Sequence, residues 1–113
     1  MKLDEYQREI EKFDCFNGAK KVSDPGFMAK VLGLCGESGE VAEKFKKILR
    51  DKGGELSDED RVEIAKELGD VLWYVATISR YMGISLNEVA EGNIEKLTSR
   101  FDRGKIHGKG DNR

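Results

Sequence analysis

The chain has 113 residues, 37% of them charged and 38% apolar, and its formal net charge is −2. This length suits one compact domain, and the weakly acidic balance argues against a protein that binds nucleic acid polymers, because such proteins are usually basic. The chain also lacks an apolar run near the roughly 20 residues of a membrane span and the apolar block of a signal peptide, so we expect a cytoplasmic protein that does not enter a membrane.

Apolar residues recur at helical spacing along most of the chain, which predicts an all-α protein. The first helix is predicted from about Leu3 to Phe16, with an apolar stripe formed by Leu3, Tyr6, Ile10 and Phe13. The second begins at Asp24, a favourable N-cap, with Pro25 at its first position, and it runs to about residue 52. Glycines inside this helix indicate either a kink near residues 33–36 or a close approach by another backbone or a ligand.

Capping-box sequences at residues 57–60 and 85–88 start a third and a fourth helix. The third is predicted to end at Met82, because Gly83 is a favourable residue just beyond a helix, and the fourth to end near Arg103.

Together these elements predict one bundle-like domain of four to five helices over residues 1–103, followed by a flexible, glycine-rich tail over residues 104–113. The third helix is apolar on nearly all sides over residues 71–78, which a few short helices cannot cover alone, so we expect an oligomer. Cys15 and Cys35 are expected to be buried thiols and not a disulfide.

Two short segments echo each other, since residues 37–41 read Glu-Ser-Gly-Glu-Val and residues 67–71 read Glu-Leu-Gly-Asp-Val. On a helix, a spacing of three places both acids of a pair on one face. Two such helices that face each other would bring four carboxylates together, and these repel unless a cation lies among them. Hard divalent cations, above all Mg²⁺, take oxygen ligands of this kind, so the pattern indicates a magnesium site.

A second interpretation of the acid pairs stays open, namely two solvated helix faces, because the chain has 22 acidic residues and such spacings are common. Gly39 and Gly69 favour the metal site, because a helix interior disfavours glycine and a small residue lets another helix or a phosphate approach. At about 100° per residue the acids border the predicted core face. That face centres on Leu34, Val41 and Phe45 in the second helix and on Leu68, Leu72 and Val75 in the third.

At this point the sequence resembles a known family, the all-α nucleoside triphosphate pyrophosphohydrolases of the MazG type. The resemblance rests on an ExxE pair, 26 intervening residues and an ExxD pair. The flanking segments GLCGESGEVAEKFKK and EIAKELGDVLWYVATIS are also similar, as is the Asn93-Ile94-Glu95-Lys96-Leu97 segment of the fourth helix. The similarity covers roughly residues 27–101.

The resemblance implies that the protein cleaves a nucleoside triphosphate or its deoxy form to the monophosphate and pyrophosphate, with Mg²⁺ or Mn²⁺ as cofactor and as a homodimer or tetramer. It implies that the metal-binding and catalytic residues are Glu37, Glu40, Glu67 and Asp70. It implies that Asn93 and Lys96 bind the substrate. Arg100, one turn after Lys96, either joins them or lies on a solvated face. Tyr74 lies on the acid side of the third helix by its position and could stack on a base. Which carboxylate accepts the proton of water stays open, and Glu40 is one candidate. The favoured position for Trp73 is the core or a subunit interface.

Two other functions stay open beside this one. The chain could be related to the phosphoribosyl-ATP pyrophosphohydrolase of histidine biosynthesis, which uses a similar site on another substrate. It could also be a helical module that binds nucleotide or forms dimers without turnover. The four intact acids favour an enzyme over such a module.

Overall fold

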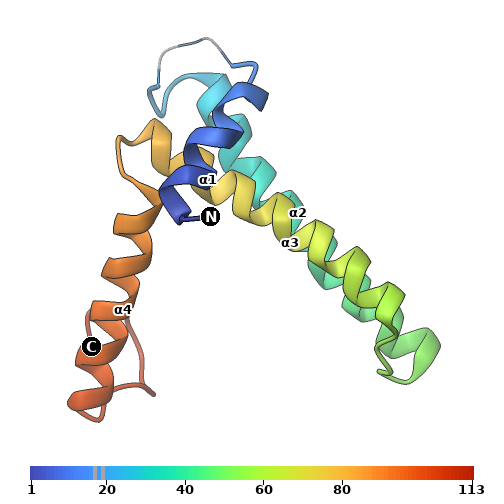
Figure 1. Ribbon diagram of the computed structural model, residues 1–113. Coiled ribbons are helices and arrows are strands. Elements are labelled where there is room, and N and C mark those ends of the chain that lie inside the picture. Colours follow the sequence, from blue (N-terminus) through green and yellow to red (C-terminus); the bar gives the residue numbers. More distant parts are fainter. Residues whose placement is uncertain (17, 19) are drawn as a thin grey trace.

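The computed structural model describes residues 1–16, 18 and 20–113. All regular structure among these residues is helical, so the predicted all-α fold is confirmed (Figure 1). No described helix is long and apolar enough to cross a membrane. The elements in chain order are α1 (Leu3–Ile10), the short 3₁₀ helix η1 (Glu11–Phe13), α2 (Pro25–Lys52), α3 (Asp58–Tyr81) and α4 (Leu86–Asp102).

Most helix ends follow the capping signals in the sequence. The Asp24 carboxylate accepts a hydrogen bond from the Gly26 amide at 2.9 Å and starts α2. Ser57 and Asp60 exchange the two bonds of a capping box, at 3.0 and 3.1 Å, and start α3. Gly53, with φ of 61°, ends α2 in the left-handed conformation that glycine adopts without strain.

One predicted helix boundary is wrong. The first helix does not continue to Phe16, because α1 gives way to η1 after Ile10 and the backbone becomes extended at Asp14. Of the two interpretations left open for the glycines of the second helix, the kink near residues 33–36 is absent, because α2 is one continuous helix. Gly33 instead allows a close approach by another helix, since a Cβ there would collide with the ring of Tyr74 on α3.

The helices form an open V (Figure 1). α2 and α3 run antiparallel as a long hairpin, with α1 packed across the end of α3 that leads into α4. α4 then leaves in a different direction and forms the second arm. Residues 104–113 form a series of turns along the end of α4, where the Arg113 guanidinium donates to backbone carbonyls of the same segment. The flexibility of this tail stays a prediction.

The main buried cluster lies where α1, α3 and α4 meet, and consists of Ile10, Ala76 and Leu86. A buried amide side chain stabilises the same junction through hydrogen bonds. The Gln7 Nε2 donates to the carbonyls of Ala76 and Ile84 at 3.0 and 3.2 Å. The Gln7 Oε1 accepts from the Leu86 amide at 3.0 Å. One side chain of α1 thus satisfies backbone groups of two other elements, which buried polar groups require.

The predicted core face of the hairpin is right only in part. Leu34, Val41 and Val75 are half-buried, and Val75 packs against the buried cluster, whereas Phe45, Leu68 and Leu72 remain exposed in the single chain. Ile48 and Ile64 are buried between α2 and α3, so the seam of the hairpin lies to one side of the predicted core face.

The two cysteines are exposed and unpaired, so the prediction that they are buried is wrong. Cys35 lies about 200° round α2 from Glu37, which faces α3, and therefore points outward. Cys15 follows Asp14, whose side chain points inward from extended backbone, so the next side chain points to the opposite side.

The single chain is larger and more exposed than a compact domain of its length. Its radius of gyration is 17.0 Å, against about 13 Å for a compact domain of this length. Its accessible surface is 8074 Å², against about 6,200 Å² for a compact monomer of this mass. The excess of roughly 1,900 Å² on one chain is about twice the roughly 800 Å² that each partner buries in a protein–protein interface of standard size.

A buried carboxylate fixes the segment between η1 and α2. The Asp14 side chain is only 3% exposed and lies 2.9 Å from Arg80 Nη2 and 3.3 Å from Lys30 Nζ. It also accepts hydrogen bonds from the Tyr81 hydroxyl and the Phe16 amide. Burial alone raises the pKa of Asp14, but the hydrogen bonds and the charge of Lys30 outweigh it and lower the pKa from 3.8 to about 2.

Replacing Asp14 with Asn is therefore expected to destabilise the fold by about 2 kcal/mol at pH 7. Because the pKa is lower in the folded chain, the carboxylate stabilises the fold above pH 3.8, and this contribution disappears as the pH falls through about 2. Urea unfolding of both proteins at one concentration, from pH 7 down to pH 2, measures the difference.

The matched control for this prediction is Glu11→Gln. Glu11 meets the same Arg80, at 3.7 Å, but is exposed, so its loss should cost under about 1 kcal/mol. Equal destabilisation by both variants would contradict the role assigned to burial.

Candidate functional site

Three acidic side chains converge on the seam of the hairpin. Glu37 of α2 and Glu67 and Asp70 of α3 each offer a carboxylate oxygen, and these oxygens lie within 4.8 Å of one another. The antiparallel pairing of α2 and α3 produces this cluster, because each helix presents an acid to the other at the same level. The sequence repeat thus does bring acids of both pairs together.

The cluster carries an excess of negative charge. Burial raises the pKa of Glu37, and the charges of Asp70, Glu67 and Glu40 raise it further. Lys44 is the cation that the structure places against the cluster, with its Nζ 3.8 Å from Glu67 Oε1. Oxygen donors with this charge fit a hard divalent cation such as Mg²⁺, so the residues present suit the predicted metal.

Glu40 lies outside this group of three. It is exposed and lies about 60° further round α2 than Glu37, away from α3. The space beside the repeated glycines is open as well, since a Cβ at Gly39 or Gly69 would meet no atom within 4 Å. The expectation that these two glycines admit a close neighbour is therefore not met within the chain.

The three predicted substrate-binding residues of α4 do not reach the carboxylates within one chain. Asn93 is exposed on the arm that points away from the hairpin (Figure 1). Lys96 and Arg100 instead contact the tail, with Lys96 Nζ 3.0 Å and Arg100 Nη2 2.9 Å from Asp111 Oδ1. Their substrate-binding role stays a prediction.

A pocket of about 340 Å³ opens beside the carboxylates, and it is lined by Phe13, Glu37, Asp70, Trp73 and Tyr74. Tyr74 thus lies on the acid side, as its helical position predicted. Trp73 lines the same pocket and also packs against the buried cluster, in keeping with the core role that its position favoured. The Trp73 and Tyr74 rings meet edge to face, with centroids 5.0 Å apart.

Two residues beside the site were not found from the sequence. Phe13 was assigned to the buried stripe of the first helix together with Ile10, and only the end of α1 at Ile10 turns it out to solvent. Lys44 carries a signal that could have found it, because it lies two helical turns after Glu37 and so on the same face.

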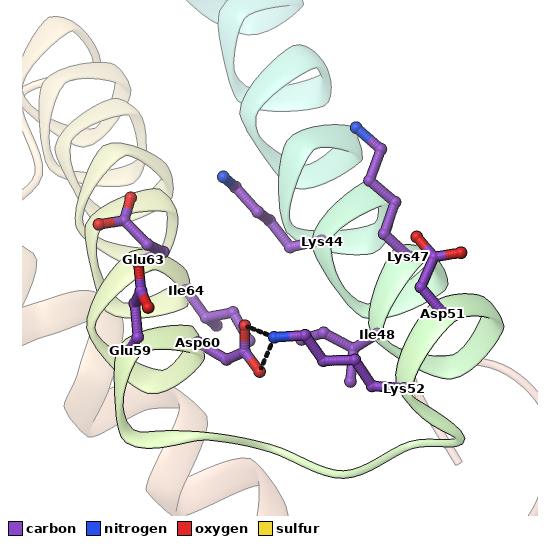
Figure 2. A pocket seen from close by; sticks show the side chains of 9 residues that line it. All are labelled: Lys44, Lys47, Ile48, Asp51, Lys52, Glu59, Asp60, Glu63 and Ile64. Carbon is purple, nitrogen blue, oxygen red and sulfur yellow. Dashed lines mark hydrogen bonds and ion pairs between the residues drawn. The ribbon is translucent and has the colours of Figure 1, made fainter.

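A second pocket, of about 270 Å³, lies at the free end of the hairpin (Figure 2). Figure 2 shows Lys52 reaching from α2 to Asp60 of α3, and its Nζ lies 2.8 and 2.9 Å from the two carboxylate oxygens. Lys44 and Lys47 also line this pocket and already pair with Glu67 and Glu43, each at 3.8 Å. The Lys52–Asp60 and Lys44–Glu67 pairs join the two helices, and with the Lys47–Glu43 pair within α2 they leave no surplus of cations for an anionic ligand.

The sequence is similar to one protein family and to two known proteins. The sequence model described as the MazG nucleotide pyrophosphohydrolase domain matches residues 27–104. The chain is 45% identical to the Gene 37 protein of Mycobacterium phage L5 over 114 aligned residues, which cover both chains entirely. It is 35% identical to the protein named Uncharacterized protein YvdC of Bacillus subtilis strain 168 over 82 residues, 68% of this chain and 77% of that one. No solved structure matches the chain significantly.

Proposed function

The chain belongs to the family of MazG nucleotide pyrophosphohydrolases, and on that premise we propose that it hydrolyses a nucleoside triphosphate to the monophosphate and pyrophosphate. The observation that carries the proposal is the cluster of Glu37, Glu67 and Asp70 on facing helices. Such a cluster suits the metal that triphosphate chemistry requires, and the aromatic pocket beside it has room for part of a nucleotide.

Glu37, Glu67 and Asp70 would hold Mg²⁺, or Mn²⁺ in its place. When bound, the ion supplies charge compensation for the triphosphate and lowers the pKa of a water molecule. Glu40 is exposed and lies outside the group of three, so it remains available to a water molecule. We therefore assign Glu40 the role of proton acceptor. Water attacks the α-phosphorus, the bond from that phosphorus to the bridging oxygen breaks, pyrophosphate leaves, and a proton of the water passes to Glu40.

We further propose that the active form is a homodimer or tetramer. The excess surface of the single chain and the outward direction of α4 support this. In such an assembly Asn93, Lys96 and Arg100 of one copy would approach the carboxylates of another and bind the phosphates. The substrates would be free nucleotides of the cytoplasm and not nucleic acid polymers, in keeping with the net charge of −2.

A panel of NTPs and dNTPs tests this function, with pyrophosphate and phosphate release measured separately. We expect pyrophosphate as the product in the presence of Mg²⁺, no turnover after chelation, and recovery when Mg²⁺ or Mn²⁺ is added back. Full activity in excess chelator, or phosphate as the product, would contradict the proposal.

A further inference from the structure

The pocket beside the carboxylates has two chemically different ends. Glu37 and Asp70 form the anionic end, and Phe13, Trp73 and Tyr74 form the aromatic end. A nucleotide is divided in the same way, into charged phosphates and a flat aromatic base. We propose that the aromatic end receives the nucleobase and that Phe13 contacts it directly; this assignment rests on the proposed function for the class of substrate.

Phe13 is exposed, but the backbone that carries it is anchored. It is 64% exposed, so a base could cover much of its ring. The next residue, Asp14, is anchored by its contacts with Lys30, Arg80 and Tyr81. The anchored backbone keeps Phe13 at the pocket, which lowers the backbone entropy lost when the ring packs against a ligand.

The opposite wall of the pocket is equally well supported. Tyr74 packs closely over Gly33, where no other residue would leave room for its ring. Trp73 meets Tyr74 edge to face and also packs against the buried cluster of Ile10, Ala76 and Leu86. Aromatic rings fixed in this way offer a stacking surface that suits any base, because every base has a π face.

Calorimetry with two probes tests this assignment in the presence of Mg²⁺. One probe is the α,β-methylene analogue of ATP, which cannot be cleaved between those phosphates, and the other is tripolyphosphate, which has no base. Phe13→Ala is expected to weaken binding of the analogue by about tenfold or more while leaving tripolyphosphate binding unchanged. Phe13→Tyr, which keeps the ring, is expected to retain the affinity of the unmodified protein.

Val22→Ala is the matched control, because Val22 is an apolar side chain of similar exposure, 67%, in the turn before α2 and outside the pocket. It should bind both probes as the unmodified protein does. Trp73 provides a second readout, since it is the one tryptophan of the chain. Its fluorescence should change saturably with the analogue and stay constant with tripolyphosphate.

The assignment is overturned if Phe13→Ala binds the analogue normally, or if it weakens both probes to the same extent. These outcomes are separable from failure of the proposed function. Base-dependent binding without pyrophosphate release would refute the hydrolase and leave the base site standing. Normal pyrophosphate release with no effect of Phe13→Ala on analogue binding would refute the base site alone.

Discussion

Replacing Asp70 with Asn is expected to reduce pyrophosphate release by at least about a hundredfold. The change keeps the shape of the side chain and removes one of three carboxylates whose oxygens lie within 4.8 Å of one another. The fold should survive, and the metal-free protein should become slightly more stable, because like charges in the cluster repel. Initial rates at saturating Mg²⁺ and thermal melting in chelator measure the two effects.

Two further variants make this prediction specific. Glu40→Gln is also expected to reduce turnover by at least about a hundredfold, through loss of the proton acceptor, while metal affinity changes little. Glu43→Gln is the control, because Glu43 is on the same helix and pairs with Lys46 and Lys47 instead of the cluster. If Glu40→Gln and Glu43→Gln had the same modest effect, the catalytic assignment of the repeated acids would be wrong.

Replacing Ile94 with Glu is expected to convert the proposed oligomer into monomers and to lower turnover with it. Ile94 is 63% exposed on α4, the arm that packs against little of its own chain. In the proposed oligomer a second copy covers part of the surface excess of roughly 1,900 Å², and a charge on the covered face of α4 would be a buried ion without a partner. Sedimentation at micromolar concentration should show at least a dimer for the unmodified protein and a monomer for the variant.

The control for assembly is Val22→Glu, which introduces the same charge at an equally exposed site in the turn before α2. It should sediment as the unmodified protein does. A clean monomer for the unmodified protein at micromolar concentration would remove our account of how the apolar faces of α3 and α4 are covered.

The sequence predicted the local features of this fold well, because these depend on neighbouring residues. Asp24 with Pro25, and Ser57 with Asp60, placed the starts of α2 and α3 correctly, and the caps form the hydrogen bonds expected of them. The repeated acid pairs likewise predicted that acids of both helices would meet, and three of the four do.

The directions of the helix faces could not be predicted in the same way. Counting apolar residues identifies a face that must be covered, but it does not say whether the cover comes from the same chain. Leu68 and Leu72 were therefore assigned to the core, whereas both remain exposed and the buried Ile64 lies only one helical turn before Leu68. Phe13 was misplaced for a related reason, since its exposure depends on Asp14 finding partners some 66 residues away.

The open V also bears on what a melting temperature of this protein would mean. In the proposed oligomer, the chain gains part of its folding free energy only when copies associate. Dilution of such an assembly favours unfolding by mass action, and unfolding becomes a reaction of more than one molecule. The midpoint of thermal unfolding should therefore rise as the protein concentration rises.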